Sequence, residues 1–205
     1  MDGTLFKSES VTVPAVQETF RDAGLEIPDA VFTLNFIGSP MAELAKWVQS
    51  VCGDRDAHAL MSQIDARELE LVDSVGQLYP DVTAMLERLR GDYRALALCT
   101  NGESKYVNRV IDSQNIRRFF DVIRFRTSAQ DTKPDMAAEI LRNLGITRGV
   151  VTGDRREDVE AAHHNSLKAI GAGYGYGSED ELKHADAVAA NAGEIPALVA
   201  QVLNN

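Results

Sequence analysis

The chain has 205 residues, a formal net charge of −10 at pH 7 and a hydrophobic content of 44%. This is enough for one packed domain, or for a core with a smaller appendage. The acidic balance argues against a nucleic-acid partner, because a polyanion would be repelled, and no apolar run has the length of a membrane span. The separated cysteines Cys52 and Cys99 are typical of thiols in a reducing compartment, so we expect a cytoplasmic protein.

The first residues, MDGTLFKSES, begin with turn chemistry. The dipeptide Asp2-Gly3 normally follows a strand, and the apolar run after it is too short to be a core strand. We therefore expect the first core strand to be missing from these 205 residues, and we expect the natural protein to begin upstream of Met1. The strand edges that flank the missing strand should be unpaired.

Residues 11–75 have mostly helical periodicity. A first stretch ends near Gly24 and has apolar residues at Val13, Val16, Phe20 and Ala23. A second opens after Gly38-Ser39-Pro40 and has them at Met41, Leu44, Ala45 and Val48. A third covers residues 60–71. Pro40 suits the start of the second helix. These residues predict an all-helical unit without strands.

Beyond Tyr79-Pro80, short apolar runs alternate with helical patterns. The expected strands are 94–99, 121–125, 149–152, 168–172 and 185–189, and the expected helices are 82–89, 104–113, 134–144, 157–165 and 193–203. This alternation predicts an α/β fold, a doubly wound, Rossmann-like parallel sheet with helices on both faces. Residues 1–10 and 77–205 would form this core, and residues 11–76 an inserted helical cap.

Two of the expected strands are followed by groups that can bind an anion. Thr100, Asn101 and Gly102 follow the strand ending LALC, where a hydroxyl and main-chain N–H groups near a helix start suit an oxyanion. Lys133, just before Pro134, can point back over the strand ends as a compact cation. Each signal also has a purely structural interpretation. Residues 100–102 could form a helix-capping turn, and Lys133 could be a solvated surface lysine.

Carboxylates follow the strand GVVT. Asp154 comes directly after Gly153, and Asp158 lies one helical turn later on the same face. Such a pair is typical of ligands for a hard divalent cation, although Asp154 alone could simply cap the helix.

In combination these signals are stronger, because the carboxyl ends of parallel strands share one edge of a sheet. We expect Asp2, Thr100, Lys133 and Asp154 to meet there. Two carboxylates ~4 Å apart repel by about 4 kcal/mol at an effective dielectric near 20, so the cluster calls for a cation. A divalent ion beside oxyanion donors indicates phosphoryl chemistry.

Four motifs, in this order, resemble the haloacid dehalogenase-like (HAD) hydrolase superfamily. They are MDGTL, CTNG, TKPD and GDRRED, and the helical insert with its loop FIGSP is similar to that family's α-helical cap. The resemblance is to the phosphoglycolate phosphatase / β-phosphoglucomutase-like branch. In this family the first Asp of an Asp-x-Asp pair attacks phosphorus to form an aspartyl-phosphate, and the second protonates the leaving oxygen and then activates water.

The resemblance implies a role for each matching residue. Asp2 and Lys133 would be catalytic, Thr100, Asn101, Gly102 and Lys133 would bind the phosphoryl group, and Asp2, Asp154 and Asp158 would hold Mg²⁺, with Asp158 in support. The nucleophile would stand immediately before Met1, so the 205 residues by themselves are expected to be inactive.

Three other positions depart from the family pattern. Lys7 stands where relatives often have an acid, Pro80-Asp81 where Pro-Gly is common, and Asn165-Ser166 where Ala-Gly is usual.

The function expected from this resemblance is a Mg²⁺-dependent phosphatase, phosphoglycolate phosphatase-like, acting on a small phosphorylated metabolite as a monomer or homodimer. A phosphosugar mutase with the same core is one alternative. A non-catalytic phosphate-binding relative is another, which retention of the acid/base Asp2 disfavours.

Overall fold

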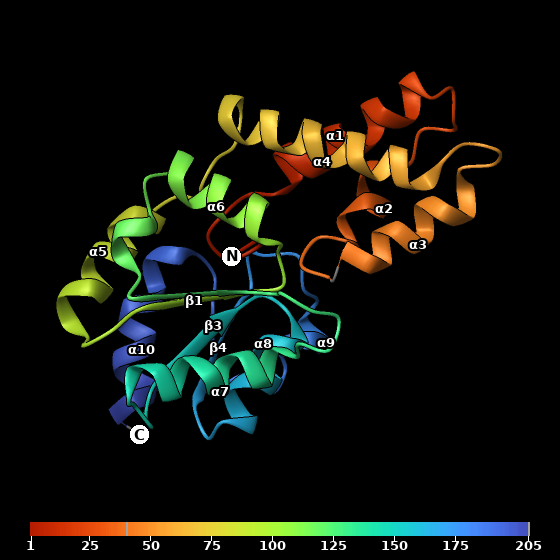
Figure 1. The fold of residues 1–205 in the computed structure, drawn as a ribbon. Helices are drawn as coiled ribbons and strands as arrows, with labels where there is room; N and C mark the ends of the chain where they lie inside the picture. The colour runs from red at the N-terminus through yellow and green to blue at the C-terminus, as the bar shows by residue number, and fades with distance from the viewer. Residues whose placement is uncertain (40, 205) are drawn as a thin grey trace.

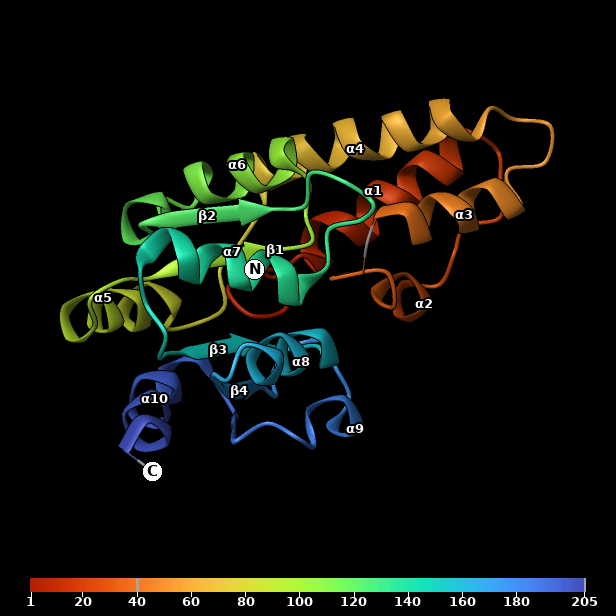
Figure 2. The same ribbon diagram turned by 60° about the horizontal axis from the view of Figure 1, so that its bottom comes forward.

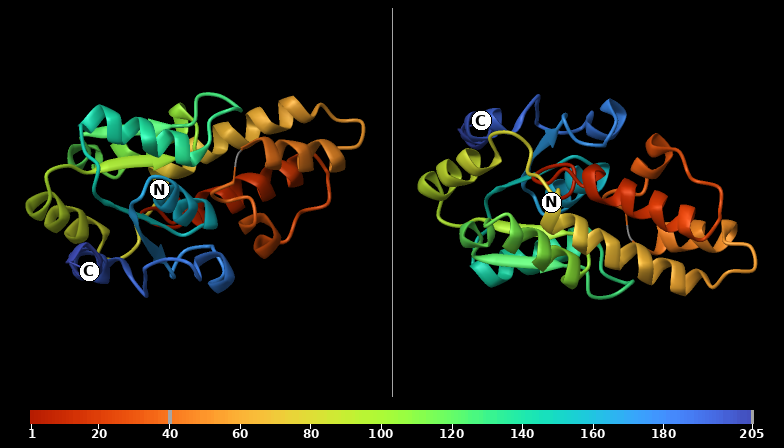
Figure 3. Two further views of the ribbon diagram at one scale, coloured as in Figure 1. Left: turned by 90° about the horizontal axis from the view of Figure 1, so that it is seen from below. Right: turned by 90° about the horizontal axis from the view of Figure 1, so that it is seen from above.

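The computed structural model describes residues 1–39 and 41–204. Four helices come first: α1 (Glu9–Asp22), α2 (Ala30–Leu34), α3 (Met41–Val51) and α4 (Ala57–Ser74). Together they project to one side of the strands (Figures 1 and 3). The predicted all-helical stretch is confirmed, and its expected start at Pro40 lies outside the described residues. None of the described helices has both the length and the apolar character that a membrane crossing requires.

The helical layer has an apolar core of its own. Val16 and Phe20 of α1 pack with Leu44 and Val48 of α3 and with Ile64 of α4. The helix α1 ends before Gly24, whose φ of +63° suits a glycine better than any other residue. The boundaries of a cap at 11 and 76 remain a prediction.

The remaining elements alternate as expected from the sequence. They are α5 (Val82–Asp92), β1 (Ala97–Thr100), α6 (Ser104–Ser113), β2 (Val122–Phe125), α7 (Lys133–Leu144), β3 (Val150–Gly153), α8 (Arg156–His164), β4 (Lys168–Ala172), α9 (Glu179–Leu182), β5 (Ala187–Ala189) and α10 (Ile195–Asn204). The short helix α9 was missed from the sequence because its acidic turn EDEL has no apolar periodicity. The first strand starts at Ala97, three residues later than predicted.

The strands form two parallel sheets, which confirms the α/β fold class. β1 pairs with β2, and β4 lies between β3 and β5. Among the described residues no strand joins β1 to β3, so both have an unpaired edge, as predicted. Figure 2 shows β1 and β2 on one side of this division and β3 and β4 on the other.

The space between the two sheets is an apolar cavity of about 610 Å³. It is lined by Leu98 of β1 and Val151 of β3, and by side chains from four helices, such as Met85, Ala137, Ala161 and Val199. Met1 also borders this cavity, so the start of the described chain lies at one of its ends. Strand edges that face such a cavity have main-chain groups free to pair with a further strand.

Two of the departures from the family pattern occupy left-handed backbone. Asp81 has a φ of +65° and Ser166 a φ of +56°. Glycine adopts this region at no steric cost, which is the physical reason for a glycine there in relatives. At the third departure, the Lys7 ammonium lies over the ring of Tyr79, 5.6 Å from its centre.

Candidate active site

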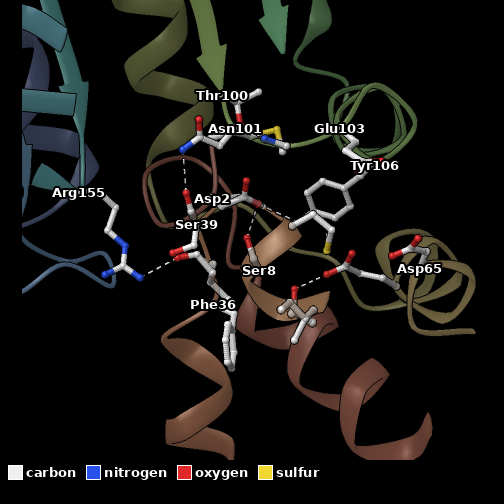
Figure 4. A pocket seen from close by; sticks show the side chains of 18 of the residues that line it. Asp2, Ser8, Phe36, Ser39, Asp65, Thr100, Asn101, Glu103, Tyr106 and Arg155 are labelled. Carbon is white, nitrogen blue, oxygen red and sulfur yellow. Dashed lines mark hydrogen bonds between the residues drawn. The ribbon is translucent and has the colours of Figure 1, made fainter. Parts of the chain in front are cut away.

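All seven residues singled out from the sequence line one cavity, and Figure 4 shows three of them, Asp2, Thr100 and Asn101, near one another. They are Asp2, Thr100, Asn101, Gly102, Lys133, Asp154 and Asp158. The cavity has a volume of about 120 Å³ and lies where the carboxyl ends of β1 and β3 face the helices α1, α3 and α4. The structure thus brings together residues from four separate segments at the sheet edge where ligands of open α/β folds bind.

Asp2 lies in a tight turn in which the N–H groups of Leu5 and Phe6 donate to the carbonyl of Met1. Its carboxylate oxygen Oδ1 accepts hydrogen bonds from the Ser8 hydroxyl and, at 2.8 Å, from the Tyr106 hydroxyl. Burial, and then the charge of Asp2, raise the pKa of Tyr106 well above its ordinary value, so this phenol remains a donor. Two hydroxyls therefore hold the carboxylate in one orientation.

The residues at the end of β1 form a turn and a bridge to the loop before α3. The Gly102 N–H donates to Thr100 Oγ1 over 3.2 Å, which closes the turn at the strand end. The Asn101 amide donates to Gly38 O at 3.1 Å and to Glu157 at 2.8 Å. Asn101 therefore links the loop before α3 to the core, an arrangement that the sequence motif did not indicate.

Lys133 begins α7, and its ammonium lies 2.6 Å from Asp158 Oδ1. Both side chains are 10% exposed. Burial alone would lower the pKa of Lys133, but the charge and hydrogen bond of Asp158 raise it above the ordinary value. The lysine is therefore a permanent cation in the cavity wall. The other Asp158 oxygen accepts the Arg155 N–H at 3.0 Å.

Asp154 follows β3 and is 3% exposed. It accepts hydrogen bonds from the Thr4 hydroxyl at 3.2 Å and from the Tyr176 N–H at 3.0 Å. The helix α8 begins later, at Arg156, so Asp154 does not cap it. Burial, and then the charge of Asp158, raise the pKa of Asp154. An ionised carboxylate here would be stabilised by a cation.

Glycines allow the chain to crowd around Asp154. A Cβ on Gly3, which has a φ of +68°, would lie 2.1 Å from Asp154 Oδ2. A Cβ on Gly175 would lie 2.3 Å from the Asp154 Cβ, and one on Gly177 1.8 Å from its carbonyl oxygen. The glycine-rich segment after β4 is therefore the physical means by which three stretches of chain reach one carboxylate.

The oxygen ligands near Asp154 suit a hard cation. Within 1–39 and 41–204, no three or more His, Cys, Asp or Glu side chains are grouped to hold a metal ion. Mg²⁺, however, commonly binds one or two carboxylates together with waters and phosphate oxygens. Asp154 can supply such a carboxylate, and Asp2, which lines the same cavity, can supply its main-chain carbonyl. The place of Asp158 among the ligands remains a prediction, since its oxygens already contact Lys133 and the Arg155 N–H.

A family model for haloacid dehalogenase-like hydrolases matches residues 1–172 of the chain. The chain belongs to this family. The match includes every one of the seven cavity residues above, and it confirms the family predicted from the four motifs.

Curated relatives of this HAD-like hydrolase are phosphatases by name. A 5'-nucleotidase from Pseudomonas aeruginosa is 27% identical over 191 residues, which are 89% of this chain and 84% of the relative. A phosphoglycolate phosphatase from Yersinia pseudotuberculosis is 28% identical over 203 residues, 93% of this chain and 87% of the relative. The HAD-like chain is therefore a hydrolase related to enzymes of phosphoric monoesters.

Solved structures show the same HAD fold. A predicted phosphoglycolate phosphatase from Haemophilus somnus superimposes with a TM-score of 0.87 at 20% identity, covering 97% of this chain and 94% of its own. A putative β-phosphoglucomutase from Thermotoga maritima has a TM-score of 0.80 at 19% identity, covering 99% and 97%. At these identities the likeness concerns the fold alone.

The HAD motifs did not indicate several residues that shape this cavity. Ser8 and Tyr106 orient Asp2, and Arg155 donates to Ile37 O over 2.7 Å. Glu68 of α4 also lines the cavity. The motifs are recognisable by their spacing, but the contacts of Tyr106 with Asp2 and of Arg155 with Ile37 form only when segments far apart in the chain pack together.

Glu68 predicts a pH dependence of stability for this HAD-like chain. It is 6% exposed, and burial, opposed by the Thr12 hydrogen bond, raises its pKa from 4.5 to about 7. Between these values the folded chain holds a proton that the unfolded chain releases, so the free energy of unfolding falls as pH rises. A shift of this size corresponds to a loss of about 3 kcal/mol.

The variant Glu68→Gln is expected to show little of this fall in the free energy of unfolding with rising pH. Urea unfolding at pH 4.5 and pH 8 measures it, with Glu70→Gln as the matched control, because Glu70 is exposed on the same helix. Equal pH dependence in Glu68→Gln and the parent chain would contradict the prediction.

Proposed function

We propose that this chain carries the acid–base, phosphate-binding and cation-binding groups of a Mg²⁺-dependent phosphatase of the phosphoglycolate phosphatase-like type. The observation that supports the proposal most is that Asp2, Thr100, Lys133 and Asp154 line one cavity. The small cavity volume, about 120 Å³, favours a small phosphorylated metabolite. The free thiols Cys52 and Cys99 are consistent with a cytoplasmic enzyme.

Each residue has a distinct part in the proposed reaction. The Lys133 ammonium and the Thr100 hydroxyl would bind oxygens of the phosphoryl group, where fixed donors stabilise charge as it develops. Asp2, oriented by Ser8 and Tyr106, would give a proton to the leaving oxygen and later take one from water. The main-chain carbonyl of Asp2 and the carboxylate of Asp154 would hold the Mg²⁺ ion. When bound, that ion would neutralise negative charge on the phosphate.

The proposal predicts that the chain binds inorganic phosphate only when Mg²⁺ is present. Calorimetric titration with phosphate, with and without MgCl₂, measures this. The variant Asp154→Asn is expected to weaken phosphate binding at least about tenfold, because a single charge-assisted ligand contributes more than 1.4 kcal/mol. The matched control is Asp92→Asn, which removes an exposed carboxylate at the end of α5.

Two results would contradict the proposed function. One is phosphate binding that is indifferent to Mg²⁺ and to Asp154→Asn. The other is an equal loss of binding in Asp92→Asn, since that carboxylate lies outside the cavity.

A further inference from the structure

One wall of the cavity is acidic in a way that phosphate binding does not explain. Asp65 and Glu68 of α4, and Glu103 just before α6, line it together with Lys105. Figure 4 shows Asp65 and Glu103 on the side away from Arg155. These carboxyl groups come from helices that face the strand ends, so they border the space for the part of a ligand beyond its phosphoryl group.

Glu68 is the most deeply buried of the three. It is 6% exposed, and its oxygen Oε1 accepts a hydrogen bond from the Thr12 hydroxyl. No donor to its second oxygen, Oε2, is present in the part of the chain that the structure describes. Oε2 is not among the buried atoms that lack a partner, so it is accessible, and a donor on a ligand in the cavity that Glu68 lines could bind it.

The neighbouring charges leave this wall negative. Burial and the Glu103 carboxylate raise the pKa of Asp65, while Lys105 partly lowers it. The positive charge of Lys105 therefore already interacts with Asp65. The cation at the opposite side, Arg155, donates to Ile37 O at 2.7 Å and pairs with Glu181 at 3.3 Å. A second anionic group on the ligand would therefore meet carboxylates, whereas hydroxyl or amino groups would meet acceptors.

We propose that the alcohol part of the substrate presents hydroxyl or amino donors and no second anionic group, and that Glu68 accepts one of these donors. The inference rests on the proposed phosphatase function, and it distinguishes the substrate of this chain from phosphoglycolate. It assigns to this cavity phosphate esters of polyols, sugars or amino alcohols, in preference to esters of hydroxy acids.

Calorimetric titrations of the 205-residue chain in MgCl₂ at pH 7.5 test the inference with four ligands. Inorganic phosphate reports the phosphoryl subsite alone, and ethyl phosphate adds an alcohol part without polar groups. Glycerol 3-phosphate adds hydroxyl donors, and 2-phosphoglycolate adds a carboxylate. We expect glycerol 3-phosphate to bind at least fivefold more tightly than ethyl phosphate, and 2-phosphoglycolate at least fivefold more weakly.

The variant Glu68→Gln isolates the proposed contact. It replaces a double acceptor by an amide that has one acceptor, which Thr12 occupies, and one donor. The advantage of glycerol 3-phosphate over ethyl phosphate should then fall to less than twofold, a ratio in which any effect common to both esters cancels. Glu70→Gln, about 200° away around the same helix, should not change this ratio.

The outcomes separate the two proposals. Tighter binding of 2-phosphoglycolate than of ethyl phosphate would overturn the inference while leaving the phosphatase function standing. An equal weakening of all four ligands by Glu68→Gln would overturn it too, since that result indicates a purely structural role. If inorganic phosphate itself does not bind, the proposed function fails, and the inference fails with it.

Discussion

Replacement of Lys133 by alanine is expected to lower the free energy of unfolding by about 3–5 kcal/mol and to abolish phosphate binding. The ammonium lies 2.6 Å from Asp158, and both side chains are 10% exposed. Without the lysine, the Asp158 carboxylate stays buried with the Arg155 N–H as its remaining donor. Removing one partner of a buried pair costs more than the pair itself contributes. Urea unfolding at pH 7.5 and phosphate titration measure the two effects.

A second ion pair provides the matched control. Lys168 lies 3.0 Å from Asp186, but these side chains are 44% and 24% exposed, so Lys168→Ala should cost less than about 1 kcal/mol. The double variant Lys133→Met with Asp158→Asn should recover part of the stability lost in Lys133→Ala, because no buried charge remains unpaired. A cost below 1 kcal/mol for Lys133→Ala would contradict the prediction.

The second large effect concerns the covalent step. The 205-residue chain is expected to form no aspartyl-phosphate, because Met1 stands directly before Asp2 and the family's nucleophile would precede Met1. The same chain preceded by an apolar strand of about five residues that ends in Asp is expected to become phosphorylated and to turn over. In that extended chain, Asp2→Asn should lower kcat by about 10²–10⁴-fold, the usual contribution of a positioned acid/base.

Mass spectrometry of protein quenched during reaction with a phosphate ester and Mg²⁺ detects the phosphorylated aspartate. The control is the same extended chain with alanine as its last added residue, which keeps the strand and removes the carboxylate. A phosphorylated 205-residue chain would show that another residue is the nucleophile. Transfer of the phosphoryl group to a sugar without release of phosphate would favour a mutase over a phosphatase.

The added strand also tests the cavity between the sheets. Apolar side chains that enter the space between β1 and β3 bury surface and offer partners to two unpaired edges. The alanine-terminated control should therefore unfold at a higher temperature than the 205-residue chain, although it has no nucleophile. This readout separates the contribution of the strand to stability from its contribution to chemistry.

The local pattern of the sequence was sufficient to predict most of the secondary structure. The helix 104–113 and the strand 168–172 have the predicted bounds, because their apolar periodicity and their breakers agree. Val13, however, is only half-buried although it was placed on the apolar face of the first helix. Val11 and Ala15 are buried in its place, since α1 contributes Val11 to the apolar cluster around the strands and Ala15 to the cluster of the helical layer.

The sequence by itself determined the fold class, the family and the seven residues around the cavity, because motifs at strand ends are local and the order of strands brings their ends to one edge. Only the tertiary structure decided their partners. Tyr106 donating to Asp2, Asn101 bonded to Gly38, and Glu68 buried beside Thr12 each join residues more than 50 positions apart. Such contacts depend on how elements far apart in the chain pack against one another, which no periodicity along the chain encodes.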